Sequence, residues 1–516
     1  MSHSHGPTQL PFTHPDEEMP IQPMFTFFFV LVGALAKPIP SSTLVSCLAN
    51  HSLAFETSQS SDWDTSTTPF NLRYHYQPAA IVYPTQTNQV SEAVKCAAQH
   101  GFRVSPLSGG HSYSASGFGQ DGTLVVSLRN MTQLSYNTGD GSVNVQPGTH
   151  LGDFALELSD KYGRAAAHGI CPYVGLGGHA GFGGWGLSSR NWGLVIDQVL
   201  AADLVLADGT TRHVSKTEHP DLFWAIRGAS SSFGIVTQYQ LQTHAAPTSV
   251  IRFALNFNVA DRPVPLFAQE FARLLTAYQT WGLKTPKEMG IVTNIWQGGR
   301  DIEMAGYFMG DMTSFNAAFQ PLLDATGKPN ATYIQERGWV AALTEASGGT
   351  TLSTIGTPDI HDTFYAKSLT VRNDTLITTA AFEKLANFMM TAPKPGLLSE
   401  TFIQFELWGG EESKISSISS DATAYPHRSH HFTVQFYGRS KSEWSTACTE
   451  YVDGLTDSIT SEMPAAKFGG YANYLDPELA GWQRKYYAEN YDRLEKLQKE
   501  YDPRGVFSKH QNVGSS

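Results

Sequence analysis

Glycine is concentrated in one short run of the chain, and this run limits the folds that the sequence can adopt. Seven glycines lie between Gly175 and Gly186. Glycine has no side chain, so backbone in such a run can come very close to a neighbouring segment or to a ligand. Successive backbone N–H groups in turns of this kind bind phosphate. The run therefore predicts a loop that packs around a phosphate-bearing ligand.

Part of this run imitates a dinucleotide-binding fingerprint. Residues 181–186 match G-x-G-x-x-G, and Asp203 follows about twenty residues later. The fingerprint requires a strand before it and a helix after it. Residues 187–196 instead contain Asn191-Trp192-Gly193 and no apolar helical stripe. We therefore reject a Rossmann-type NAD site and keep the phosphate-binding interpretation.

Composition and charge exclude several classes of protein. The 516 residues are 41% apolar and 16% charged, which provides a large core and excludes disorder along most of the chain. The net charge of −12 provides no basic surface for nucleic acid or for an anionic membrane. We expect a soluble monomer that binds neither.

The amino terminus resembles a secretory leader. An apolar run over residues 25–36 ends in Ala34-Leu35-Ala36, as in a signal peptide with its cleavage site, and it is too short to span a bilayer. The acidic residues 16–18 do not suit the region before such a run, so translation starting at Met24 is an alternative to Met1. A buried apolar segment is the competing interpretation. We predict a leader over residues 1–36 and a secreted chain, which four sequons fit: Asn50, Asn130, Asn330 and Asn373.

Two of the four cysteines suit a disulfide. Cys47 follows the expected cleavage site, and Cys96 lies in the helix-like segment 90–100. A secreted chain allows such a bridge, so we expect Cys47 and Cys96 to tie the mature amino terminus to the body. Cys171 stands at the head of the glycine run.

Hydrophobic periodicity predicts an α+β protein of two intertwined domains. Strands at 79–83, 102–104 and 124–126 and a helix at 88–100 form a small βαβ unit. A strand at 143–145, a helix at 151–162 and a hairpin around Asp208-Gly209 follow. Apolar alternation from residue 251 to about 468 is mixed with helical stretches such as 378–391, and an amphipathic helix is expected over 476–501.

Two motifs together carry a family resemblance. The first is Ser108-Gly109-Gly110-His111-Ser112, and the second is His168-Gly169-Ile170-Cys171 about sixty residues later. With both motifs, the chain resembles the flavin oxidases of the vanillyl-alcohol oxidase and berberine-bridge-enzyme superfamily over residues 76–511. Within it, the chain most resembles the fungal gluco-, cello- and chitooligosaccharide oxidases.

The resemblance implies a domain plan. It predicts a two-subdomain FAD-binding domain of the PCMH type over residues 37–247. A substrate domain over 248–468 is expected to hold an antiparallel sheet flanked by helices. Residues 469–516 are expected to return to the FAD domain.

The resemblance also implies a doubly linked FAD. It joins His111 to the flavin 8α-methyl and Cys171 to C6, which leaves no Cys171 thiol for a disulfide. Two covalent links fix the ring and make it a stronger oxidant. The residues expected to bind the cofactor are His111, Cys171, Ser108, Gly109, Gly110, Ser112, Gly175, Gly177, Gly178, Gly181, Gly234 and Val236.

The substrate side is predicted from alternation and from the same resemblance. In residues 401–410, Gln404, Glu406 and Trp408 share one face of a strand, and Gln435 lies similarly in residues 432–437. The segment Tyr471-Ala472-Asn473-Tyr474 resembles the family motif that supplies the catalytic tyrosine, here Tyr474. Glu406 would be its acidic partner, one methylene longer than the aspartate of the family. The expected substrate residues are Tyr113, Asn294, Gln404, Gln435 and Tyr471, with Trp408 as a stacking candidate.

The resulting prediction is a secreted oxidase that converts the anomeric C1 hydroxyl of an oligosaccharide to a lactone. A hydride passes to flavin N5, and oxygen is reduced to hydrogen peroxide. One alternative is a berberine-bridge-like oxidase of an alkaloid, phenolic alcohol or secondary metabolite, and another is a non-catalytic carbohydrate-binding protein. The electron acceptor is also open, since a quinone or another acceptor can take the place of oxygen. Glucose-, N-acetylglucosamine- and xylose-type chains stay open, with Asn294 at a specificity position. We expect no metal site at His427, His430 and His431, because the last two point to opposite strand faces.

Overall fold

The structure is a computed structural model that describes residues 41–259 and 263–515. The leader predicted over residues 1–36 lies outside the described residues. None of the helices in the described ranges is long and apolar enough to cross a membrane.

The first sheet is four-stranded and carries the predicted βαβ unit. Its order is β1 (Phe55–Glu56), β2 (Ala80–Val82), β4 (Leu124–Ser127), β3 (Val104–Leu107), and β4 pairs in parallel with both β2 and β3. Helix α3 (Thr87–Gln99) connects β2 to β3. The strand predicted at 102–104 begins only at Val104, because Gly101 takes a φ of +75° and the N–H of Phe102 bonds back to the last turn of α3.

The predicted disulfide is present in this region. Cys47 of α1 (Ser42–Asn50) is bonded to Cys96 of α3. The bridge joins the first described helix to the βαβ unit, as expected. Cys171 and Cys448 are free.

The second sheet has five antiparallel strands in the order β5 (Leu134–Tyr136), β6 (Ser142–Val145), β10 (Ile235–Gln242), β8 (Val199–Val205), β9 (Thr211–Ser215). The hairpin between β8 and β9 turns at Gly209, whose φ is +79°, as the Asp-Gly signal predicts. Helices α4 (Leu151–Tyr162) and α8 (Pro220–Ala229) contribute to the core beside this sheet.

The glycine-rich run contains one short helix and is followed by two more. Helix α5 (Leu176–Gly181) precedes residues 181–186, and α6 (Ser189–Trp192) and α7 (Val195–Gln198) follow. A helix therefore stands where a Rossmann fingerprint needs a strand, which confirms the rejection of that fold.

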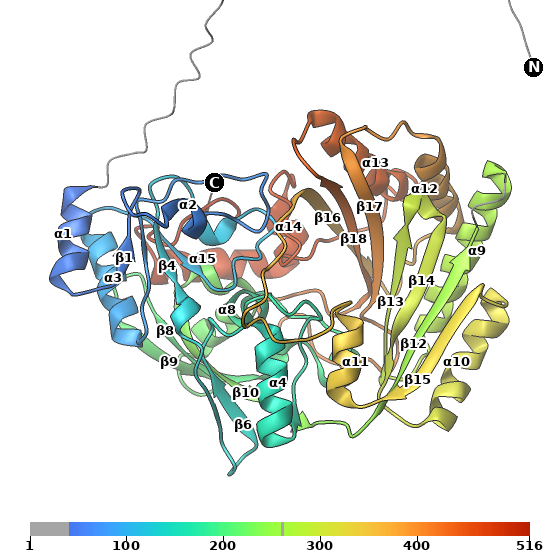
Figure 1. Ribbon diagram of the computed structural model, residues 1–516, viewed down its shortest axis with the longest axis horizontal. Helices are drawn as coiled ribbons and strands as arrows, with labels where there is room; N and C mark the ends of the chain where they lie inside the picture. Colours follow the sequence, from blue (N-terminus) through green and yellow to red (C-terminus); the bar gives the residue numbers. More distant parts are fainter. Residues whose placement is uncertain (1–40, 260–262, 516) are drawn as a thin grey trace, which may run out of the picture. The chain divides into compact units, whose positions relative to one another are not determined.

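Residues 250–440 build a seven-stranded antiparallel sheet. The order is β15 (Ala331–Arg337), β12 (Val250–Asn258), β14 (Asp301–Phe308), β13 (Met289–Trp296), β17 (Leu398–Leu407), β18 (His430–Ser440), β16 (Thr363–Arg372). One face carries α9 (Val264–Gly282), α10 (Met312–Thr326), α12 (Thr379–Thr391) and α13 (Thr446–Thr460), as Figure 1 shows. Together, the three larger sheets give the predicted α+β class, with two sheets within residues 55–242 and an antiparallel sheet flanked by helices within residues 250–440.

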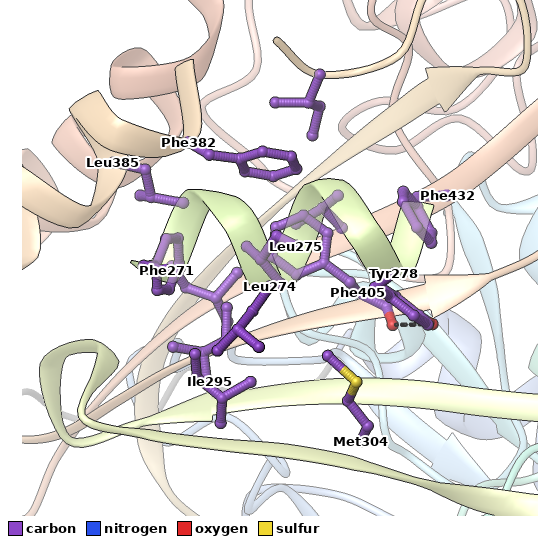
Figure 2. Packing of buried hydrophobic residues seen from close by; sticks show 14 of the residues in the cluster. Phe271, Leu274, Leu275, Tyr278, Ile295, Met304, Phe382, Leu385, Phe405 and Phe432 are labelled. Atoms are coloured by element: carbon purple, nitrogen blue, oxygen red, sulfur yellow. Dashed lines mark hydrogen bonds between the residues drawn. The ribbon is translucent and has the colours of Figure 1, made fainter. Parts of the chain in front are cut away.

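The packing of these helices on the sheet determines which strand side chains point into the core. Phe405 of β17 and Phe432 of β18 lie in the core beneath α9, with Leu274 and Phe382 from the helices (Figure 2). Burying each such side chain contributes about 1.5–3 kcal/mol. Because successive residues of a strand alternate between faces, Phe405 in the core sends Gln404 and Glu406 to the opposite face.

The C-terminal segment is not the single helix predicted over 476–501. It contains α14 (Trp482–Tyr487), a 3₁₀ turn (Ala488–Asn490) and α15 (Tyr491–Tyr501), and the φ of Ala488 is +42°. Asp476 is outside any helix, because Pro477 follows it and the residue before a proline disfavours the helical conformation. Lys367 holds its carboxylate at 2.8 Å. Further on, the N–H of Val104 donates to Val506 O at 2.7 Å, which brings the tail to the first sheet.

A buried ion pair joins distant segments of the chain. Arg428, just before β18, donates to both carboxylate oxygens of Asp197 in α7 at 2.8 and 2.7 Å. The side chains are 1% and 7% exposed.

The remaining short elements are α2 (Trp63–Ser66), α11 (Trp339–Ala346), β7 (Arg164–Ala165) and β11 (His244–Ala245).

Candidate functional site

A cavity of about 330 Å³ lies between the glycine-rich loops and the seven-stranded sheet. Every residue predicted to bind the cofactor lines it except Gly181. A Cβ on Gly181 would meet Ser230 Cβ at 2.9 Å, so this glycine allows close packing of α5 outside the cavity wall. The two motifs that define the resemblance therefore meet at one cavity.

The two glycine motifs touch backbone to backbone. A Cβ added to Gly109 would lie 2.3 Å from Gly175 N, and one added to Gly175 would lie 2.1 Å from Gly109 N. Ser108 secures the contact, since its Oγ donates to Pro147 O and accepts from the N–H of Gly177 at 3.2 Å. Gly178, by contrast, has nothing within 4 Å of a built Cβ. This wall exposes backbone to the cavity, as a dinucleotide with its pyrophosphate requires, so the residues present fit FAD.

The residues expected to link the flavin both line this cavity. His111 stacks on Phe70 with ring centroids 4.0 Å apart, and its Nε2 lies 2.8 Å from Asp359 Oδ2. Cys171 is a free, exposed thiol. An imidazole and a thiol on one wall are two nucleophiles available to a bound group.

Tyr474 and Glu406 form a hydrogen-bonded pair in the same cavity. The phenol of Tyr474 donates to Glu406 Oε1, and Trp408 Nε1 donates to Oε2 at 3.0 Å. Burial raises the pKa of Glu406 to about 7, although both hydrogen bonds lower it. Burial and the neighbouring Glu406 raise the pKa of Tyr474 well above 10. The carboxyl group can therefore hold or release a proton near neutral pH, whereas the phenol alone cannot.

Two further tyrosines surround this pair. Tyr113 stacks on Tyr474 with centroids 5.5 Å apart and accepts a hydrogen bond from Gln435 Nε2 at 2.7 Å. The hydroxyl of Tyr471 accepts from the N–H groups of Gly184 and Trp185 at 3.0 and 3.3 Å. Tyr471 lines the cavity, but these bonds tie it to the glycine run.

Polar substrate candidates form a row across the sheet. Register pairs Asn294 with Gln404 and Gln404 with Gln435. Gln404 Nε2 donates to Asn294 Oδ1 at 2.8 Å, and Asn294 Nδ2 donates to Glu303 Oε2 at 3.2 Å. Gln404 lines the cavity, while Asn294 and Gln435 stand behind the residues that do.

The stacking surface expected at Trp408 lies elsewhere. Trp408 is fully buried, donates to Glu406 and stacks on Trp185 at 5.8 Å. The next row outward from Gln404 is aromatic instead: Phe402 lies 5.0 Å from Trp296 and 4.8 Å from Tyr437, and all three are half-buried. Alternation puts Phe402 on the same face as Gln404 and Glu406, a signal that the sequence already contained.

Two other residues at the cavity were not predicted. Asp359 comes from a loop 248 residues away from its partner His111, and no motif marks it. Lys509 lines the cavity near the C-terminus, donates to Ser116 O at 3.0 Å, and has its pKa lowered to about 8 by burial. A lysine in a polar tail gives no sequence signal of burial.

Two of the three histidines set aside as metal ligands bond to backbone carbonyls. His427 Nε2 lies 3.0 Å from Lys485 O, and His431 Nε2 lies 2.8 Å from Gln279 O. Within the described ranges, the group with metal-ligand spacing is Cys47, His51 and Cys96, and its two sulfurs are bonded to each other.

Fold and cavity together define a dinucleotide-binding oxidoreductase with a buried acid–base pair. Residues 78–215 match the family described as FAD binding domain, and residues 470–514 match the family described as Berberine and berberine like. The chain is similar to the chitooligosaccharide oxidase of Gibberella zeae, with 35% identity over 95% of this chain and 98% of that one. The xylooligosaccharide oxidase of Thermothelomyces thermophilus is 33% identical over 95% and 98%.

A solved structure is also similar to this chain along most of its length. Glucooligosaccharide oxidase from Acremonium strictum, whose FAD is named as 6-S-cysteinyl, 8α-N1-histidyl, matches with a TM-score of 0.84 and 31% identity over 91% of this chain and 99% of that one. The chain belongs to the FAD-linked oligosaccharide oxidases of the berberine-bridge-enzyme-like family. Its cofactor is FAD.

Proposed function

We propose that the protein is a secreted oxidase that converts the anomeric C1 hydroxyl of oligosaccharides to the lactone and reduces oxygen to hydrogen peroxide. The observation that carries the proposal is the buried Tyr474–Glu406 pair in the cavity that His111 and Cys171 also line. A binding protein without catalysis needs no buried proton acceptor, so this pair favours an enzyme.

When bound, FAD would supply the redox chemistry, as the acceptor of the C1 hydride and the source of two electrons for oxygen. His111 and Cys171 would hold it covalently. The two loops that carry Gly109 and Gly175 would support the pyrophosphate through backbone N–H groups.

The protein's part in the reaction is proton transfer. Tyr474 takes the C1 hydroxyl proton as the hydride leaves, and its own phenolic proton moves to Glu406. With its pKa raised to about 7 by burial, Glu406 accepts that proton at neutral pH and releases it afterwards. Trp408 keeps the second carboxylate oxygen in place.

Substrate positioning follows from the two rows on the sheet. Because Gln404 Nε2 is committed to Asn294, its Oε1 is the atom available to accept a sugar hydroxyl. The half-buried aromatic row of Trp296, Phe402 and Tyr437 suits the apolar faces of further sugar rings. The relatives named above act on chains of different sugars, so we propose the oligosaccharide class.

Secretion and the domain plan complete the proposal. Three sequon asparagines, Asn50, Asn130 and Asn330, are exposed, which suits a glycosylated extracellular monomer. The proposed domains are residues 37–247 for FAD, 248–468 for substrate and 469–516 as the returning segment.

The test combines mass spectrometry with a peroxide assay. FAD mass on the tryptic peptides of His111 and Cys171, together with peroxide formation from gluco-, chito- or xylooligosaccharides, is the expected result. Tyr474→Phe is the matched control, which should keep the flavin and lose turnover. A colourless protein with unmodified peptides would overturn the proposal.

A further inference from the structure

We propose that Asp359 is a positioning residue for covalent attachment of the flavin: it holds Nε2–H of His111 and thereby leaves Nδ1 as the nucleophile. The inference rests on the proposed link between His111 and FAD, and it concerns how that link is made.

The contact between the two residues lies beside the cavity, which His111 lines and Asp359 does not. Asp359 Oδ2 lies 2.8 Å from His111 Nε2, and the opposite oxygen accepts the N–H of Ile360 at 2.9 Å. Phe70 stacks on the imidazole at 4.0 Å with an interplanar angle of 22°, so the ring cannot turn freely. The side chains of His111 and Asp359 are only 9% and 24% exposed.

The loop that carries Asp359 is anchored on both sides. Before it, the N–H of Thr354 donates to Asp153 of α4 at 3.1 Å, and Tyr173 bonds to Thr357. After it, Asp362 accepts from Arg439 at 3.1 Å. The carboxylate therefore meets His111 in a fixed position.

The charge of Asp359 decides which imidazole nitrogen is free. A neutral imidazole has one N–H and one lone pair, and an ionised carboxylate only accepts hydrogen bonds. Burial alone would raise the pKa of Asp359, but its hydrogen bond with His111 helps to leave it below the ordinary value. Asp359 stays ionised near neutral pH, so the proton sits on Nε2 and the lone pair on Nδ1. An aspartate orients the histidine of serine proteases in the same way.

The attachment step balances with oxygen as the oxidant. One C–H bond of the 8α-methyl breaks and a bond from that carbon to Nδ1 forms. The ring proton on Nε2, which becomes acidic as Nδ1 is alkylated, passes to Asp359. The two electrons released go through the flavin to O₂, which takes two protons and becomes hydrogen peroxide.

The glucooligosaccharide oxidase from Acremonium strictum fits this choice of nitrogen. Its flavin is described as 8α-N1-histidyl, and N1 in flavin usage is Nδ1. In this chain, Nδ1 is the nitrogen that the contact with Asp359 leaves free.

The test is peptide mapping of the purified full-length protein by mass spectrometry. We expect FAD on both peptides of the wild type. In Asp359→Asn, we expect the Cys171 peptide to keep FAD, while the fraction of His111 peptide that carries it falls at least tenfold. Asp160→Asn, the same change at an exposed aspartate of α4, should leave both peptides as in the wild type, and Asp359→Glu should restore part of the His111 link.

Three results would overturn the inference. One is a His111 peptide in Asp359→Asn as fully modified as in the wild type. A second arises if Asp359→Asn loses all flavin and Asp359→Glu restores none at His111. The third is a wild-type protein whose His111 peptide carries no FAD. This result would reject the link itself, and it is recognised without any variant.

Discussion

The carboxylate of Glu406 accepts a hydrogen bond from the phenol of Tyr474 at a position that solvent does not reach. The carboxylate faces the cavity because Phe405, its neighbour in β17, is fixed in the core beneath α9. Fold and site are thus coupled through one strand, because packing on one face places the Glu406 carboxylate on the other.

Removing either member of this pair should slow the reaction to a similar extent. Positioned acid–base catalysis contributes about 10²- to 10⁴-fold, so kcat of Glu406→Gln and of Tyr474→Phe should fall within that range. Because the two groups act as a unit, the double variant should be about as slow as the slower single variant. Stopped-flow reduction of the bound flavin measures this step, and independent, multiplicative losses would contradict the coupling.

The pH profile should report Glu406. Burial raises its pKa to about 7, so the carboxyl group keeps its proton up to near neutral pH. The ionised form accepts the proton from Tyr474, and therefore kcat/KM should fall as the pH drops through about 7. The slope should be absent in Glu406→Gln, measured on the same sugar from pH 5 to 9. A fall in kcat/KM at low pH that persists in this variant would assign the titration to another group.

The backbone contact between the glycine loops should not tolerate a methyl group. A Cβ on Gly109 would lie 2.3 Å from Gly175 N, a contact that only movement of a loop can relieve. We expect Gly109→Ala to be purified with less than a tenth of the wild-type flavin, measured by absorbance. Gly396→Ala, where a Cβ meets nothing within 4 Å, is the control and should retain full flavin content.

Sequence reasoning reached the parts of the site that local patterns encode. Alternation placed Gln404 and Glu406 on one face, and small residues marked the loops of Gly109 and Gly175 as ones that can approach a phosphate-bearing ligand. It failed where placement depends on tertiary contacts. Nothing near Asp359 in the chain reveals its partner.

Two other differences have the same origin. The amphipathic pattern of residues 476–501 predicted one helix, but the structure ends α14 where Ala488 takes a φ of +42° and holds Asp476 at Lys367. Trp408 was expected to meet sugar, yet its indole N–H is committed to Glu406. Alternation along a strand predicts the face to which a polar side chain points, but not the partner that it contacts.

Breaking the buried ion pair should destabilise the fold strongly. Arg428 and Asp197 are nearly excluded from solvent, and removal of one partner from a buried pair costs about 3–5 kcal/mol because the other charge stays uncompensated. Arg428→Ala should therefore lower the free energy of unfolding in urea by that amount. Arg372→Ala, which breaks an exposed pair with Asp374, should cost about 1 kcal/mol or less. Equal losses would argue against burial as the cause.

The hydrogen-bond relay behind Gln404 should control substrate binding from a distance. The Glu303 carboxylate can only accept, so Asn294 must donate to it and present its oxygen to Gln404 Nε2. A glutamine at position 303 can also donate, which allows Asn294 and then Gln404 to reverse and turn N–H toward the sugar. Loss of one well-placed hydrogen bond costs about 1 kcal/mol, or roughly fivefold in affinity. Glu303→Gln should therefore raise KM about fivefold for hydroxyl-donating sugars with little change in kcat. Glu336→Gln on β15, which bonds to Ser249, is the control. A fall in kcat with KM unchanged would mean that the relay acts on the reaction step.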